Sequence, residues 1–111
     1  MNRTRGAVLA ERVEIAASPR ARLKGLLGRG SLPEGEALVI DPCTSIHTLF
    51  MRFAIDVLFV DRAGRVLRAI GRMAPWRATR FYPSARWAAE LPAGAVARSG
   101  TCEGDEVVIE A

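Results

Sequence analysis

Apolar and polar residues alternate or form short runs along much of the chain, a pattern that predicts short β-strands separated by turns. Within residues 8–16, Val13 and Ile15 alternate with charged neighbours, which is typical of a strand with one buried face. Residues 55–60 form a continuous run rich in β-branched and apolar side chains, as expected of a central strand. Further strands are predicted at residues 36–40, 46–50, 65–70, 87–91, 95–98 and 106–110.

Turn and capping residues divide these strands and place one helix near the N-terminus. Residues 61–64 read Asp-Arg-Ala-Gly, a compact turn that makes residues 65–70 the hairpin partner of the preceding strand. Ser18 followed by Pro19 predicts the start of a helix, with serine as N-cap and proline at the first helical position. Gly28 then predicts its end within two or three turns.

Seven or eight short strands and one short N-terminal helix predict a mainly β fold. The spacing of the turns favours an antiparallel sandwich, jelly-roll-like arrangement or distorted barrel over alternating βαβ units. A chain of 111 residues can form one hydrophobic core without disulfide bonds or structural metals, and no internal repeat or low-complexity tract divides it. We therefore expect a single β-rich domain over residues 1–111.

Composition excludes several classes of protein. The chain is 50% hydrophobic and 25% charged, as in ordinary globular proteins, and its 10 glycines and 6 prolines exclude a coiled coil. No apolar run approaches the roughly 18 residues of a membrane span. The apolar stretch at residues 7–10 is shorter than the roughly 7–15 residues of a secretory signal. Two cysteines, Cys43 and Cys102, fit free thiols in a reducing compartment, so a cytoplasmic location is expected.

Charge is unevenly distributed along a chain whose net charge is +4. Residues 62–89 contain seven arginines and no acidic residue, interleaved with aromatic side chains, a pattern that suits anionic ligands including nucleic acid. Arg72, Arg77 and Arg80 are the candidate anion-binding residues. The alternative is that the arginines pair with acidic segments across the sheet while the aromatic rings pack the core or its rim. The modest net charge disfavours nucleic-acid binding.

Several short motifs follow one another along the chain. They are Gly25-Leu26-Leu27-Gly28-Arg29, Met51-Arg52, residues 55–61, Gly64-Arg65-Val66, residues 90–94 and Gly104-Asp105. In this order they resemble the small prokaryotic proteins catalogued as domain of unknown function 192, over about residues 20–111. The resemblance implies a compact β-rich sandwich or jelly-roll fold. It implies no catalytic set, because no biochemical role is established for the family. The chain departs from the commoner central motif, which has tryptophan before the methionine and a longer following segment.

The segment around residues 43–52 is the densest group of chemically active side chains. Cys43, His47 and Met51 are soft metal ligands and would share one face of a regular strand. Four strand residues span about 13 Å, too far for ligands of one ion, so we expect no metal. The same separation opposes a Cys43–His47 nucleophile and base unless Pro42 starts a turn that brings them together. Otherwise Cys43 is a small buried residue and His47 a hydrogen-bonded one.

A second group of polar residues borders the apolar strands. Arg52 could pair with Asp56 or Glu90 and fix the register of the strands, since charges near a core need partners. Alternatively, His47, Thr48, Arg52 and Glu90 could converge in a small-ligand pocket.

The leading hypothesis is a binding domain without catalytic activity, metal or cofactor. It would hold a small polar or anionic ligand or a protein partner, as a monomer or weak dimer. The alternatives are a small enzyme that uses Cys43 and His47, and weak nucleic-acid binding through residues 62–89.

Overall fold

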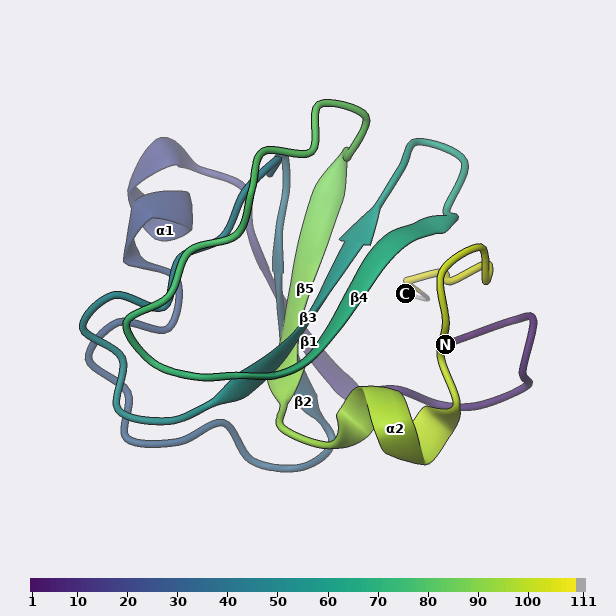
Figure 1. Cartoon of the computed structure of the whole chain (residues 1–111), viewed down its shortest axis with the longest axis horizontal. Coiled ribbons are helices and arrows are strands. Elements are labelled where there is room, and N and C mark those ends of the chain that lie inside the picture. Colours follow the sequence, from purple (N-terminus) through teal and green to yellow (C-terminus); the bar gives the residue numbers. More distant parts are fainter. Residues whose placement is uncertain (110–111) are drawn as a thin grey trace.

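Five strands form a single mixed sheet in the order β1-β2-β5-β3-β4 in the computed structural model, which describes residues 1–109 (Figure 1). Glu110 and Ala111, the end of the expected domain, lie outside the described residues. The strands are β1 (Arg12–Ala16), β2 (Glu36–Ile40), β3 (Ile55–Val60), β4 (Val66–Met73) and β5 (Trp87–Pro92), and the helices are α1 (Pro19–Lys24) and α2 (Ala95–Ser99).

The mainly β prediction is confirmed, but the sheet is neither wholly antiparallel nor closed into a barrel. β1 runs parallel to β2, whereas the β2–β5, β5–β3 and β3–β4 pairs are antiparallel. A parallel pair needs a crossover connection, and here α1 lies in the chain between β1 and β2. The short helix that the sequence predicts is therefore part of the crossover between the one parallel pair of this mixed sheet.

The core lies on both faces of the sheet, with β3 at its centre. All six residues of β3 are buried, and they alternate between the two faces. Ile55, Val57 and Phe59 pack on the face that contacts Leu26 of the segment after α1. Leu58 packs on the opposite face, which Ala95 of α2 helps to cover. This two-sided cover explains why β3 is apolar at every position except Asp56.

Helix α1 begins where its capping residues predict and ends earlier than expected. The Ser18 hydroxyl accepts a hydrogen bond from the Ala21 amide at 3.1 Å, and Pro19 occupies the first turn. The helix stops at Gly25 rather than Gly28, because Gly25 adopts a φ of +50°. A Cβ on this glycine would lie 3.7 Å from Oε1 of Glu90, so the end of the helix sits over β5.

Three of the expected strands are not formed. Residues 46–50 make only an isolated bridge between His47 and Ala78, and Phe50 turns the chain with a φ of +66°. Residues 95–98 belong to helix α2, whose first amides are held by the distant carboxylate of Asp56. Described residues near the C-terminus make isolated bridges only, and Glu110, the last residue of that expected strand, lies outside the described residues.

Candidate ligand-binding site

A pocket of about 430 Å³ lies between α1 with its following turn and the segment after β2. This volume falls within the range of small-molecule sites, roughly 300–1,000 Å³. Its walls combine an apolar surface with several polar groups. The apolar side includes Leu26, Leu27, Ile40, Ile46 and Met51, and the polar side includes Arg22, Lys24, Cys43, Thr44, Ser45, His47 and Glu90.

Glu90 is the most unusual of these groups. It lies in β5 between Leu38 of β2 and Val57 of β3, and its side chain faces the same side of the sheet as α1. The residue is 3% exposed, and its Oε1 has no hydrogen-bond partner among the described residues. Burial raises the pKa of Glu90 to about 7, against the opposing effect of the Arg29 charge. A buried carboxyl without a partner is costly, so this position calls for an explanation.

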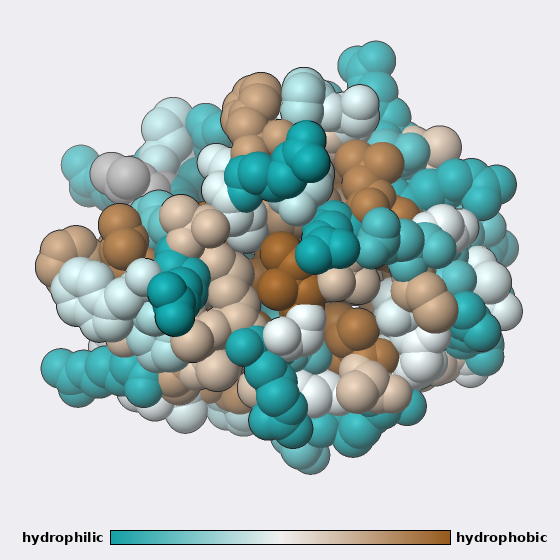
Figure 2. Space-filling model, in the orientation of Figure 1, coloured by the Kyte–Doolittle hydropathy of each residue, from teal (hydrophilic) through white to brown (hydrophobic). Residues whose placement is uncertain are grey.

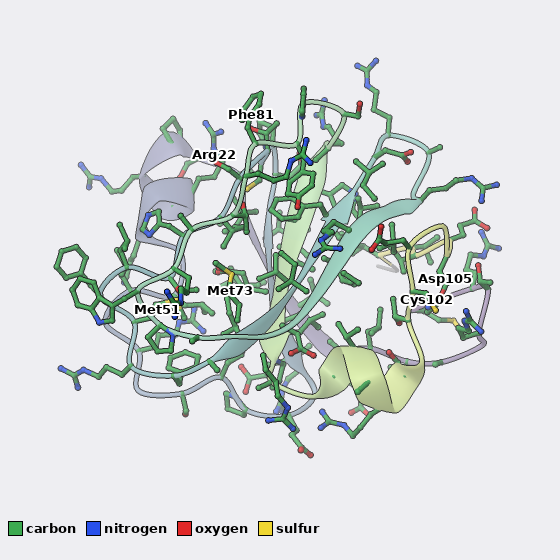
Figure 3. All side chains as sticks on the ribbon, viewed as in Figure 1. Arg22, Met51, Met73, Phe81, Cys102 and Asp105 are labelled. Carbon is green, nitrogen blue, oxygen red and sulfur yellow. The ribbon has the colours of Figure 1, made fainter. Side chains whose placement is uncertain are left out.

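Arg22 supplies the second unpartnered group in the same pocket. Its Nη1 donates to the carbonyl oxygen of Pro42 at 3.3 Å, which ties α1 to the segment after β2. Its Nε is buried and has no acceptor. In residues 1–109, Arg22 Nε and Glu90 Oε1 are the two buried side-chain polar atoms without a partner. Both belong to residues that line one pocket (Figure 3 shows Arg22 beside α1).

Cys43 and His47 both line the pocket, but each is engaged with its own loop. The thiol of Cys43 donates to the carbonyl oxygen of Ser45 at 3.1 Å. Burial raises the pKa of Cys43, and the nearby Glu90 charge acts in the same direction. Nδ1 of His47 accepts the Leu49 amide at 3.2 Å. Neither bond joins the two residues, so this arrangement does not activate a thiolate nucleophile.

The sequence predicts that four residues converge in a small-ligand pocket, and two of them lie in the same pocket. His47 and Glu90 line the pocket, whereas Thr48 and Arg52 do not. Thr48 is fully buried, and its hydroxyl donates to the Ala74 carbonyl at 2.7 Å and accepts the Arg77 amide at 2.9 Å. It therefore anchors a loop.

Arg52 is exposed and forms no ion pair with Asp56 or Glu90 among the described residues. Asp56 instead accepts hydrogen bonds from the backbone amides of Arg72, Gly94 and Val96. These bonds take the place of the expected ion pair with Arg52.

The candidate anion-binding arginines are not gathered into one site by any recorded contact. None of Arg72, Arg77 and Arg80 lines the pocket, and none forms an ion pair within residues 1–109. The Arg80 guanidinium lies 5.3 Å from the ring centre of Tyr82, whose ring packs on Phe59 in the core. The alternative interpretation of this segment fits better, since other arginines pair with acidic segments, Arg68 with Glu103 and Arg86 with Asp41.

Sequence reasoning missed Arg22 and the whole contribution of α1. The pattern predicts the helix but gives no sign that it crosses over Glu90, which is distant in the chain. The Gly25-Leu26-Leu27-Gly28-Arg29 motif was the available signal, because Gly25 makes the close approach and Leu26 and Leu27 line the pocket.

A second cavity lies on the opposite face of the sheet and differs in character. It measures about 610 Å³ and is lined mainly by apolar side chains, among them Val13, Ile15, Leu58, Trp87 and Leu91. Neither of the unpartnered buried polar atoms belongs to it. Apolar side chains are also visible between hydrophilic ones over the face drawn in Figure 2. Of these two cavities in the described part of the chain, only the first is lined by residues with buried polar atoms that have no hydrogen-bond partner.

Two further findings concern the described residues as a whole. No helix in residues 1–109 is long and apolar enough to cross a membrane. The same residues contain no group of three or more histidine, cysteine, aspartate or glutamate side chains placed to hold a metal ion.

The fold and pocket define a β-rich protein in which an N-terminal helix covers a buried carboxyl group on a mixed sheet. The chain belongs to the DUF192 family of uncharacterized proteins, whose sequence profile matches residues 1–109. The match thus begins earlier than the resemblance at about residue 20 indicated. A UPF0127 protein of Thermococcus sibiricus is 32% identical over 96% of this chain and 71% of its own length.

Two solved structures share the fold. A protein of unknown function from Novosphingobium aromaticivorans superimposes with a TM-score of 0.79 at 22% identity, covering 87% of this chain and 74% of its own. A proposed transcription regulator from Sinorhizobium meliloti gives a TM-score of 0.74 at 24% identity, covering 85% of this chain and 78% of its own. These relatives indicate the fold and no particular activity.

The two cysteines are expected to differ strongly in reactivity. Cys102 is exposed, whereas Cys43 is partly buried with a raised pKa, so less of it is thiolate at a given pH. We expect a disulfide reagent at pH 8 to modify Cys102 at least tenfold faster, measured separately in the Cys43→Ser and Cys102→Ser variants. Figure 3 shows Cys102 on the side of the molecule away from Arg22 and Met51. Faster reaction of Cys43 would contradict this and would favour the enzyme alternative.

Proposed function

We propose that this protein is a non-catalytic binding domain that holds a small polar ligand in the pocket between α1, with its following turn, and the segment after β2. The carrying observation is that the two unpartnered buried polar atoms, Arg22 Nε and Glu90 Oε1, belong to residues lining one cavity. A protein rarely leaves such groups unpaired, because each costs about 1–3 kcal/mol. A ligand that accepts from Arg22 and pairs with Glu90 would recover this cost on binding.

The other pocket groups support binding rather than catalysis. Cys43 and His47 are held by Ser45 and Leu49 and lack the mutual hydrogen bond of a nucleophile and its base. Both cysteines carry free thiols, which supports the cytoplasmic location expected from the sequence. The domain is proposed to act as a single β-rich unit over the whole chain.

The proposal predicts that a compound from a defined panel raises the melting temperature of the parent protein at pH 8. The panel contains L-amino acids, hydroxy acids, primary amides, sugars and polyamines at millimolar concentration. A compound that binds only the folded state stabilises it by about 2.7 kcal/mol at one hundred times its Kd. The measurement is thermal unfolding followed by fluorescence, then calorimetric titration of each compound that shifts the midpoint.

Matched variants locate the binding. Glu90→Gln and Arg22→Gln are expected to weaken it, because the first removes the negative charge of the unpartnered carboxyl group and the second removes the unpartnered Nε. Arg52→Gln is the control, because Arg52 is an exposed arginine outside the pocket lining. The proposal fails if no panel compound shifts the midpoint, or if the compounds that do bind the two pocket variants as tightly as the parent.

A further inference from the structure

The pocket is lined by charges of both signs. Glu90 is buried in the sheet, whereas Arg22 on α1 is half-buried and Lys24 at the end of α1 is exposed. A simple anion would be attracted to the two positive side chains and repelled by an ionised Glu90. A simple cation would be attracted to Glu90 and repelled by Arg22 and Lys24. Neither kind of ligand satisfies both unpartnered groups.

We propose that the ligand is a small zwitterion of the α-amino acid class, with its ammonium group at Glu90 and its carboxylate at Arg22. This inference rests on the proposed function and names the chemical class of its ligand. An ammonium donates only and suits a carboxylate, whereas a carboxylate accepts only and suits a guanidinium. Such a ligand supplies to each unpartnered atom the charge and hydrogen bond that it lacks.

The rest of the cavity fits the size and polarity of an amino acid. A volume of about 430 Å³ lies at the small end of ligand pockets. Leu26 and Met51 are buried residues of the apolar lining and offer a surface for an aliphatic side chain. The hydroxyl-bearing residues Thr44 and Ser45 line the same cavity. L-Leucine is therefore the probe, with isoamylamine and isocaproate as analogues that lack its carboxylate or its ammonium group.

Binding of an ammonium group requires ionised Glu90, so the affinity should depend on pH. Besides burial, the positive charge of Arg29 acts on Glu90, and Glu90 in turn raises the pKa of Cys43. Arg22, Lys24 and His47 line the same pocket. Because the pKa of Glu90 in the free protein is about 7, the affinity for leucine should fall about tenfold per pH unit below pH 7. His47→Gln, at a second polar residue of the same lining, is the control and should leave the profile unchanged.

The test is calorimetric titration of the parent protein at pH 8 with leucine, isoamylamine and isocaproate. Leucine is expected to bind at least tenfold more tightly than either analogue. Glu90→Gln should abolish the advantage of leucine over isocaproate, and Arg22→Gln should abolish its advantage over isoamylamine. Arg52→Gln should keep both advantages, because Arg52 lies outside the pocket lining.

Failure of this inference is distinct from failure of the proposed function. In one outcome, panel sugars, amides or hydroxy acids bind and lose affinity in the Glu90 and Arg22 variants, but leucine and the other amino acids bind no better than their analogues. This outcome would exclude a zwitterionic ligand, and the pocket would remain a binding site. If no compound of any class binds, the proposed function fails and the inference fails with it. Equal leucine affinity at pH 5 and pH 8 would also overturn the pairing of its ammonium group with Glu90.

Discussion

The Glu90→Gln variant is expected to be more stable than the parent protein at pH 8, by about 3 kcal/mol. The pKa of Glu90 rises from its ordinary 4.5 to about 7 in the folded protein, because burial disfavours the ionised form. Between these pH values the folded state keeps a proton that the unfolded state releases. The parent therefore loses stability as the pH rises from 4.5 to 7 and stays less stable above it. Glutamine is neutral throughout and avoids this loss.

Urea unfolding at pH 4.5, 6 and 8 measures this difference. The two proteins should be nearly equal at pH 4.5 and diverge steadily above it. Asp105, whose pKa is lowered to about 2 by hydrogen bonds from Cys102, Arg5 and Asn2, titrates in a lower window and is common to both proteins. Glu11→Gln, at an exposed position, controls for the removal of one acidic charge. A variant less stable than the parent at pH 8 would contradict the burial of an unpartnered carboxylate.

A stabilising substitution that abolishes ligand binding would separate the two roles of this position. Functional groups are often retained at a cost in stability, because the site needs a charge that the fold alone does not. If Glu90→Gln gains stability and loses affinity together, Glu90 serves the ligand rather than the sheet.

Replacement of Asp56 by alanine is expected to reduce the free energy of unfolding by about 4 kcal/mol or more. Asp56 is fully buried, and its carboxylate accepts the amides of Arg72 at 2.8 Å, Gly94 at 3.1 Å and Val96 at 2.8 Å. Alanine leaves these three donors without an acceptor, at about 1–3 kcal/mol each. A loss of this size is a large part of the roughly 5–15 kcal/mol that stabilises a small protein.

Urea unfolding at pH 7 measures the loss, and hydrogen exchange at the Val96 amide locates it. Asp56→Asn is the matched variant, because its amide oxygen can still accept one or two of the three bonds and its loss should be smaller. Exchange should accelerate at the start of α2 in both variants before it accelerates in β3. A loss below about 1 kcal/mol for Asp56→Ala would contradict the role of this carboxylate, since that is the net value of one ordinary hydrogen bond.

The elements predicted correctly are those in which local chemistry and burial agree. The bounds of β2 and β3 match the expected 36–40 and 55–60, because each run is mostly apolar and is followed by a turn-forming residue. Helix α1 starts where Ser18 and Pro19 place it. The strand predicted at residues 95–98 is wrong, because no hydrophobic pattern or capping residue there indicates a helix. Their helix depends on amide bonds to Asp56 on β3, which no local pattern indicates.

The site was predicted less completely than the fold. His47 and Glu90 were identified as polar residues beside apolar strands, and both line the pocket. Thr48 and Arg52 were grouped with them on nearness in the chain alone, but the turn at Phe50 and the anchoring of Thr48 direct them elsewhere. Arg22 was overlooked because a single arginine on a basic helix has nothing local to distinguish it.

The amino-acid sequence by itself determined the mainly β class, the central buried strand and the capped helix. These features depend on the spacing of hydrophobic residues, on turn residues and on capping groups, which all act over a few neighbouring residues. Only the tertiary structure decided that the end of α1 lies over β5 and that the Asp56 carboxylate holds the first amides of α2. It also decided that Glu90 and Arg22, which each have one unpartnered buried polar atom, line the same cavity. These features join residues far apart in the chain. Whether a buried polar group has a hydrogen-bond partner depends on every segment packed around it. This can therefore be decided only from the folded structure.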